Sequence, residues 1–169
     1  HWQDDAWYWK KEATDWGWDW ASEKEKYLHP KYAPVNRYAE DIIGCLNNQV
    51  DGWVDWNMVL DRQGGPNWFK NWCVAPIIVD DKNDEVYFTP LYYVMSHFSK
   101  FMRPDAVKIG CEVNNKEIKV TAVQNPDKSI ALAIFNPTEQ SHAIEINISN
   151  EKSTISIPAK ALQTVVINK

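Results

Sequence analysis

The chain has 169 residues, carries a net charge of -5 and contains 10 tryptophans. This length suffices for one or two small domains with their own hydrophobic core. The acidic balance, without a cluster of lysine and arginine, argues against a nucleic-acid partner, and no apolar run is long enough for a transmembrane segment. The first five residues are polar and aromatic, unlike a signal peptide, so we expect this chain to be a piece of a longer protein.

Residues that would hold a metal or a cofactor are not grouped in any known spacing. Cys45, Cys73 and Cys111 fit neither a zinc site nor a disulfide framework, and the histidines are scattered. There is no glycine-rich phosphate loop and no pair of histidines at helical spacing. We therefore predict no cofactor and no metal, and we interpret the cysteines as buried free thiols.

Hydrophobic periodicity predicts two helices with a strand between them. Apolar residues recur at helical spacing over 35–46, and the same rhythm returns over 91–102. Between them, residues 50–57 are predicted to form a strand that is buried on both faces. A long loop, 58–75, rich in glycine, proline and tryptophan, follows this strand. Helix, buried strand, long loop and helix in this order indicate part of an α/β architecture.

Two short apolar runs at the end of the loop predict a hairpin. Residues 76–79 and 86–88 are apolar, and the polar stretch 80–85 joins them. Apolar runs of this length, separated by polar turn residues, are typical of paired strands. We expect this small hairpin to lie within the long loop, before the second helix.

The composition changes sharply after residue 101. Every tryptophan and tyrosine, and all but one phenylalanine, lie at or before Phe101. Beyond it the sequence becomes short alternating runs at 118–123, 130–135, 143–148 and 164–167, separated by turn residues such as Asn125-Pro126-Asp127. This pattern predicts a second domain built as an antiparallel β-sandwich.

Two stretches interleave tryptophan with amide and carboxyl side chains, Gly52-Trp53-Val54-Asp55-Trp56-Asn57 and Gly65-Pro66-Asn67-Trp68-Phe69-Lys70-Asn71-Trp72. A tryptophan-rich core is one explanation. A carbohydrate site is the other, because an indole face stacks on a sugar ring while polar groups bind its hydroxyls. The interleaving favours the carbohydrate site. In an α/β barrel both stretches would lie at the mouth, where loops follow the carboxyl ends of strands.

The same motifs carry a resemblance to a known family. Residues 52–57, Gly64-Gly65-Pro66-Asn67-Trp68, Pro76-Ile77-Ile78-Val79-Asp80 and His97-Phe98-Ser99-Lys100-Phe101 resemble the eighth barrel strand, the following loop and the last barrel helix of the glucosylceramidase-like glycoside hydrolases, family 30. The order and spacing of the motifs match over about residues 36–110. The resemblance implies a multi-domain α/β plus all-β fold. Residues 1–102 would form the C-terminal quarter of a (β/α)8 TIM barrel, from the loop after strand 7 to helix 8, and residues 103–169 a β-sandwich side domain.

The resemblance also implies an activity. Family members are retaining β-glycosidases that use two glutamates with carboxyl groups about 5 Å apart. Both glutamates are expected upstream of His1, so no catalytic residue is expected in this chain, and its early glutamates are interpreted as solvated charges. The residues implied to bind substrate are Trp56, Asn71 and Trp72. Those implied to support the site are Trp53, Asp55, Asn67 and Trp68.

The implied partners are a β-glycoside substrate and the N-terminal remainder of the same protein, and the family implies a secreted or lysosomal setting. The residues also allow alternative interpretations. The tryptophans of residues 1–20 either form outer sugar subsites or pack against the barrel rim. The chain is alternatively a non-catalytic carbohydrate-binding module that uses exposed tryptophan platforms. A third alternative is a structural or interaction domain whose indoles are core residues.

Overall fold

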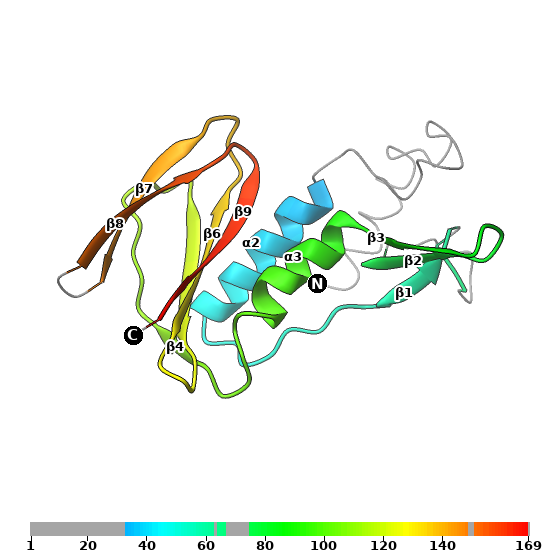
Figure 1. Cartoon of the computed structure of the whole chain (residues 1–169), viewed down its shortest axis with the longest axis horizontal. Coiled ribbons are helices and arrows are strands. Elements are labelled where there is room, and N and C mark those ends of the chain that lie inside the picture. The colour runs from blue at the N-terminus through cyan, green and yellow to red at the C-terminus, as the bar shows by residue number, and fades with distance from the viewer. Residues whose placement is uncertain (1–32, 63, 67–74, 149–150, 169) are drawn as a thin grey trace. The chain divides into compact units, whose positions relative to one another are not determined.

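The structure is a computed structural model that describes residues 33–62, 64–66, 75–148 and 151–168 (Figure 1). The described residues form two compact units. The first unit contains residues 33–35 and 54–93, and the second contains residues 36–53 and 94–168. Neither helix in the described part of the chain is long and apolar enough to cross a membrane.

The first unit is built around a three-stranded sheet of β1 (Val59–Asp61), β2 (Ile77–Asp80) and β3 (Glu85–Phe88). Strand β1 pairs with β2 in parallel, and β2 pairs with β3 in antiparallel fashion, which confirms the predicted hairpin. One face of the sheet carries Leu60 and Ile78, which form a small core with Ala75 and Tyr87. The parallel pair directs the carboxyl ends of β1 and β2 to the same edge.

The prediction of a buried strand over 50–57 is wrong. Among the described residues no strand precedes Val59, and this segment is open to solvent: Val54 is 89% exposed and Trp56 is 61% exposed. A strand buried on both faces needs ladder partners on its two edges. Among the described residues no strand pairs with 50–57, so its apolar side chains have no sheet to join.

The second unit contains a two-layer β-structure, as the sequence predicts. One antiparallel sheet has the strand order β4-β5-β6-β9, and the other is the hairpin β7-β8. The strands are β4 (Val107–Ile109), β5 (Lys119–Gln124), β6 (Ile130–Asn136), β7 (His142–Ile148), β8 (Glu151–Ile157) and β9 (Ala161–Ile167). Ile134 of the larger sheet and Ile157 of the hairpin belong to one buried cluster with Ile118, which joins the two layers.

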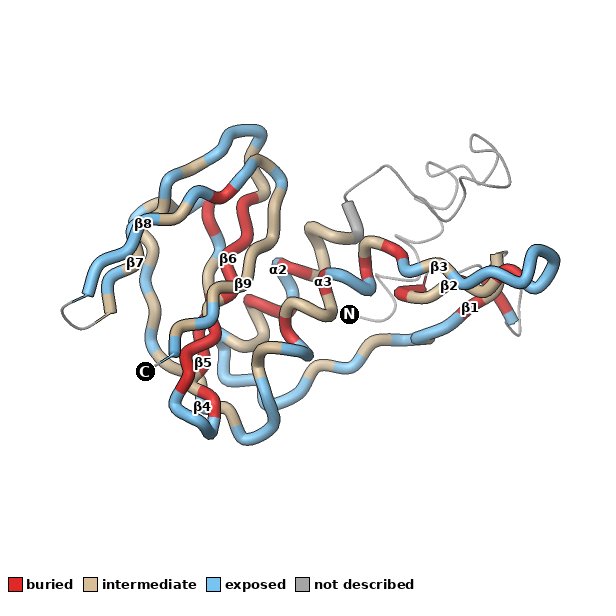
Figure 2. The backbone as a smooth tube through the Cα atoms, in the orientation of Figure 1, coloured by how far each residue is buried: buried red, intermediate tan, exposed pale blue. Residues whose placement is uncertain are grey.

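Strand β6 is the centre of this unit, because both of its faces are covered. Ile134 is 0% exposed and points into the layer shared with the β7-β8 hairpin. Ala131 and Ala133 alternate with it and are equally buried. Figure 1 shows helices α2 (Ala33–Asn47) and α3 (Pro90–Ser99) beside the larger sheet, and Figure 2 shows the buried residues concentrated along β5 and β6. Small alanine side chains on β6 allow close packing on that face.

Both helices are confirmed where the periodicity predicts them. Helix α2 buries Ala39, Ile42 and Ile43, and helix α3 buries Leu91, Val94 and Phe98. In the second unit, Asn47 at the end of α2 donates its side-chain N–H to the carbonyl of Val120 on β5 at 2.9 Å. His97 on α3 lies 2.9 Å from the hydroxyl of Thr164 on β9, measured from Nδ1. These contacts hold both helices to the larger sheet.

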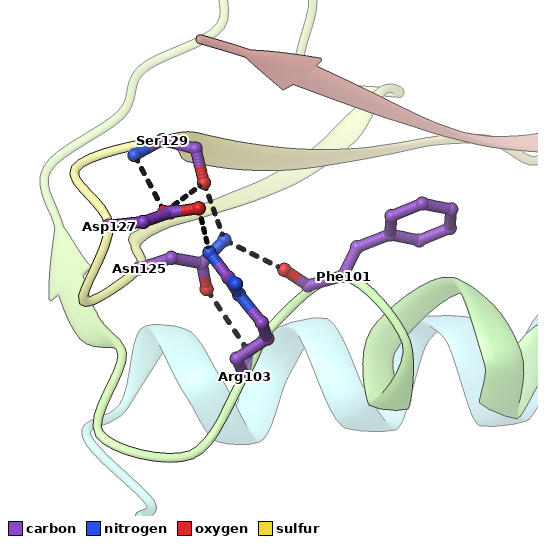
Figure 3. A network of polar contacts seen from close by, with 5 residues as sticks. All are labelled: Phe101, Arg103, Asn125, Asp127 and Ser129. Atoms are coloured by element: carbon purple, nitrogen blue, oxygen red, sulfur yellow. Dashed lines mark hydrogen bonds and ion pairs between the residues drawn. The ribbon is translucent and has the colours of Figure 1, made fainter. Parts of the chain in front are cut away.

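A polar network fastens the segment after α3 to the β5-β6 turn (Figure 3). Asn125 accepts a hydrogen bond from the backbone N–H of Arg103 and donates to the carbonyl of Phe101, both at 3.0 Å. It also donates to the hydroxyl of Ser129, and that hydroxyl donates to Asp127 at 2.6 Å. The guanidinium of Arg103 forms an ion pair with the Asp127 carboxylate.

Strands β1, β4 and β8 are not predicted from the sequence, and the predicted loop 58–75 is corrected at 59–61, which form β1 by pairing with β2. The first four residues of β8 are polar and exposed, so the alternation that marks a half-buried strand is missing there. Pairing with β7 supplies the backbone hydrogen bonds along the whole of β8, and Ile155 and Ile157 provide its inward contacts. Cross-strand pairing therefore makes a strand of a sequence whose own pattern is weak.

Candidate functional site

Trp53 is fixed against helix α2 within the second unit. Its indole Nε1–H donates to the carboxylate of Asp41 at 2.7 Å. The ring of Tyr38 meets the indole edge-on, with centroids 5.3 Å apart. An indole whose N–H and ring edge are both engaged by neighbours is held in one orientation.

Asp55, Trp56 and Asn57 begin the described stretch that leads into β1 of the first unit. The Asp55 carboxylate accepts a hydrogen bond from the backbone N–H of Trp56 at 2.8 Å. Asn57 has a φ of 62°, in the left-handed region that asparagine tolerates better than most residues. The side chain of Trp56 remains 61% exposed. The backbone around Trp56 is thus tied down locally, while the residue itself lies largely at the surface.

The loop over residues 62–76 starts in a closed turn. The Asp61 carboxylate accepts from the backbone N–H of Gly65 at 2.8 Å, and the N–H of Asp61 donates to the carbonyl of Gly65 at 2.6 Å. Gly64 has a φ of 83°, a backbone conformation that glycine adopts freely and that would be strained in other residues. The turn therefore sets the direction in which the loop leaves β1.

The other end of the loop is fixed by Thr89. Its hydroxyl lies 3.0 Å from the carbonyl of Ala75 and 3.1 Å from that of Pro76, and its backbone N–H donates to Pro76 at 2.9 Å. Thr89 is buried, so these contacts satisfy carbonyls that water does not reach. Both ends of the loop are therefore anchored to the first unit.

Arg62 and Asp80 form an ion pair at the carboxyl ends of β1 and β2. Arg62 Nη1 lies 3.0 Å from Asp80 Oδ2, and the two side chains are 13% and 1% exposed. Asn83 donates its side-chain N–H to the same carboxylate at 2.7 Å. The hydrogen bond from Asn83, together with backbone N–H groups and the charge of Arg62, lowers the pKa of Asp80 below its ordinary value, although burial opposes this shift.

Four of the seven predicted site residues, Asn67, Trp68, Asn71 and Trp72, lie outside the described residues, so their roles remain predictions. Of the others, Asp55 and Trp56 belong to the first unit and Trp53 to the second. Asp55 is half-buried and Trp56 is exposed. The roles of these three residues also remain predictions.

Three residues that organise the ends of the loop, Asp61, Arg62 and Thr89, are not predicted from the sequence. The turn at Asp61 could have been predicted, because an aspartate shortly before two glycines, here Gly64 and Gly65, is typical of a turn closed by a side chain. The Arg62–Asp80 pair has no such signal, since its partners are 18 positions apart and meet only through the β1-β2 register. Within the described ranges, no group of three His, Cys, Asp or Glu residues is arranged to hold a metal ion.

Comparisons with known proteins identify the family of both parts of the chain. The glycosyl hydrolase family 30 TIM-barrel domain matches residues 13–102, and the glycosyl hydrolase family 30 beta sandwich domain matches residues 105–165. Putative glucosylceramidase 4 of Caenorhabditis elegans is 38% identical over 110 residues, which are 64% of this chain and 21% of the relative. Lysosomal acid glucosylceramidase of Mus musculus is 33% identical over 112 residues, or 66% of this chain and 22% of the relative.

A solved structure gives the same result. SrfJ from Salmonella typhimurium superposes with a TM-score of 0.77 and 26% identity, over 79% of this chain and 30% of the SrfJ chain. The fold is therefore that of the glycoside hydrolases that combine a TIM-barrel domain with a β-sandwich domain, and this chain contains part of the first and residues of the second. The chain belongs to glycosyl hydrolase family 30. It spans about a fifth of the length of the two curated relatives described above.

Proposed function

We propose that the protein containing this chain is a retaining β-glycosidase of the glucosylceramidase type, and that this chain supplies walls of its sugar pocket. The observation that carries the proposal is the family match over 13–102, within which Trp56 is 61% exposed and has its backbone N–H bound by the carboxylate of Asp55. Relatives named glucosylceramidase support the choice of substrate class. An exposed indole next to polar groups is the chemistry that a pyranose requires.

Each predicted site residue has a proposed role. Trp56 stacks on the sugar at the cleaved bond, and Asn71 and Trp72 border the same subsite. Trp53 supports the site, a role favoured by the engagement of its N–H with Asp41. Asp55 also supports the site, because its carboxylate holds the backbone N–H of Trp56.

Asn67 and Trp68 are proposed to shape the loop that carries Asn71 and Trp72. The anchors at Asp61 and Thr89 support this proposal, since they fix where that loop leaves β1 and where it returns to β2. We also propose that residues 1–102 belong to the barrel and 103–169 to the sandwich.

Two glutamates perform the proposed double displacement. The first attacks the anomeric carbon while the second protonates the leaving oxygen; the second then activates the water that releases the sugar. Every glutamate in the described part of this chain is exposed, whereas a glycosidase general acid sits in a pocket. Together with the family resemblance, which implies that both glutamates precede His1, these exposed positions support the proposal that both lie in the part of the protein that this chain does not span. The chain alone should be inactive and should require that remainder as its partner.

The proposal is tested with the full-length protein and an aryl β-glucoside. Hydrolysis is expected, and proton NMR of the first product formed should show the β-anomer, because two displacements retain configuration. The α-anomer as first product would exclude the double displacement. Binding of a glycan without hydrolysis would instead favour the carbohydrate-binding module. The 169-residue chain alone serves as the inactive control.

A further inference from the structure

A cavity of about 680 Å³ opens between the two β-layers of the second unit. Val120 and Leu132 of the larger sheet line one wall, and Ile144 and Ile146 of β7 line the facing wall. These four side chains are only half-buried, although they belong to the cluster that joins the layers. Ile134 of the same cluster is 0% exposed. Since the centre of a sandwich is normally close-packed, this part of the core has room for a further element.

One side of the cavity is an edge of strand β7. The consecutive residues 143–148 all line the cavity. A strand that turns only its face to a cavity lines it with every second residue, so an unbroken run means that the backbone edge faces the cavity. Within the described part of the chain, β7 pairs with β8 alone. Every second residue of an antiparallel pair directs its N–H and C=O away from its partner, so β7 presents these backbone groups to the cavity.

The opposite side of the cavity is the segment that follows β4. Residues 109–115 also line the cavity in one unbroken run. Strand β4 ends at Ile109 and β5 begins at Lys119, and among the described residues no strand pairs with 110–115. The cavity is therefore a slot between a strand edge and a segment without a strand partner, with aliphatic side chains along its walls. We call it the β7 slot.

A slot of this construction is suited to an extended polypeptide. An added strand supplies its own N–H and C=O groups to the edge of β7, and its apolar side chains, at every second position, cover the aliphatic walls. A small apolar ligand would cover the walls but leave the backbone groups of β7 without partners. A source of such a strand exists in the rest of the protein, because this chain spans about a fifth of the length of the curated relatives.

We propose that the β7 slot receives a β-strand from the remainder of the same protein, which adds to the free edge of β7 and extends the β7-β8 layer of the sandwich. The strand would carry apolar residues at every second position. This inference rests on the proposed function only in taking the remainder of the protein as the partner of this chain. It names the surface through which the two parts bind, and it does not depend on the glycosidase activity.

Amide hydrogen exchange in the full-length protein tests for the added strand. With a neighbour on each side, every amide over 143–147 is hydrogen-bonded, so all should exchange at similarly slow rates. With β8 as the only neighbour, every second amide of β7 should exchange at least about 100-fold faster than the residues between. Uniformly slow exchange supports the inference, and alternating exchange along β7 overturns it.

A photo-crosslinking residue identifies the strand. Asn147 is exposed and lines the β7 slot, so its replacement by p-benzoylphenylalanine is compatible with folding. This variant of the full-length protein should form an intramolecular cross-link to one segment of the remainder. Lys152, the exposed cross-strand partner of Asn147 on β8, is the matched control position, and the same replacement there should not reach that segment. An equal yield of the same cross-link from both positions would overturn the inference.

This inference and the proposed function fail separately. A full-length protein that hydrolyses no β-glycoside, but shows uniformly slow exchange along β7 and the cross-link from position 147, overturns the proposed function alone. An active enzyme in which position 147 cross-links only a second copy of the protein or an apolar small molecule overturns the added strand alone.

Discussion

The side-chain amide of Asn125 donates a hydrogen bond to the backbone carbonyl of Phe101, 24 positions earlier in the chain, at 3.0 Å. The same side chain accepts from the backbone N–H of Arg103, so it binds one carbonyl and one N–H of the segment that leaves helix α3. Asn125 itself is 3% exposed, whereas Phe101 is half-buried and Arg103 is exposed (Figure 3). One asparagine on the β5-β6 turn therefore fixes the course of the chain into the β-sandwich.

Replacing Asn125 with alanine should destabilise the second unit. The change removes the partners of a carbonyl and an N–H at a partly buried site, and we expect a loss of about 2 kcal/mol in the free energy of unfolding. Urea denaturation of the full-length protein measures the effect. Asn114→Ala, at an exposed position, is the control and should stay near wild type. An equal midpoint for both variants would contradict the structural role of Asn125.

The lowered pKa of Asp127 leads us to expect a loss of stability in strong acid. Hydrogen bonds from the Ser129 side chain and the Arg103 guanidinium lower the pKa of Asp127 to about 2 from an ordinary value of 3.8. Because the folded state holds the proton more weakly than the unfolded state, this stabilisation is complete above the ordinary value and disappears as the pH falls through the folded pKa.

Asp127→Asn should therefore lower the melting temperature at neutral pH, and its difference from wild type should shrink between about pH 4 and pH 2. Thermal unfolding of both proteins across this range measures the difference. A gap that stays constant down to about pH 2 would show that the carboxylate charge of Asp127 plays no part.

The lowered pKa of His97 leads us to expect that stability also depends on pH in a higher pH range than that of Asp127. Burial between α3 and β9 lowers the pKa of His97 below its ordinary value of 6.5, so the unfolded chain takes up this proton more readily than the folded protein. Acidification below about pH 6.5 should therefore destabilise the fold, and His97→Gln should reduce this slope. His142→Gln, which leaves His97 in place, should retain it. Melting temperatures at pH 7.5 and at lower pH, down to about pH 5, measure the slope for each variant.

Ile134 tests the packing between the two β-layers. It is 0% exposed and touches both layers through its cluster with Ile118 and Ile157, so Ile134→Ala should cost about 2–5 kcal/mol of stability. Val166 on the neighbouring strand β9 is 40% exposed, and Val166→Ala should cost less than about 1 kcal/mol. Denaturant titration compares the two. Similar losses for both variants would mean that β6 is not the centre of the core.

Much of this fold follows from local pattern. Helix α2, helix α3 and the β2-β3 hairpin have periodicities strong enough to be found in the sequence, and so have most strands of the sandwich. The predictions from sequence fail where pairing with a neighbouring strand determines whether a segment forms a strand. Residues 50–57 have the composition of a buried strand but no partner strand among the described residues. Strand β8 has a polar composition but gains a partner in β7.

The residues of the candidate site likewise fall into those that the sequence predicts and those that only the structure reveals. Trp56 and Asp55 stand out in the sequence because their types match sugar chemistry. Arg62 and Asp80 do not stand out, because a charged residue alone is most often a solvated one. Their pairing is visible only in the structure, where the β1-β2 register brings the two side chains together in a buried position.

The most direct test of the account is the kinetics of Trp56→Ala in the full-length protein, with Val54→Ala as the control. Val54 is 89% exposed and lies two positions away, so both variants alter exposed side chains of one segment. If Trp56 is a wall of the sugar pocket, kcat/KM for an aryl β-glucoside should fall at least about tenfold in Trp56→Ala and stay within about twofold of wild type in Val54→Ala. An unchanged kcat/KM in Trp56→Ala, in an enzyme that is active and folded, would contradict the central claim that this chain forms part of a saccharide cleft.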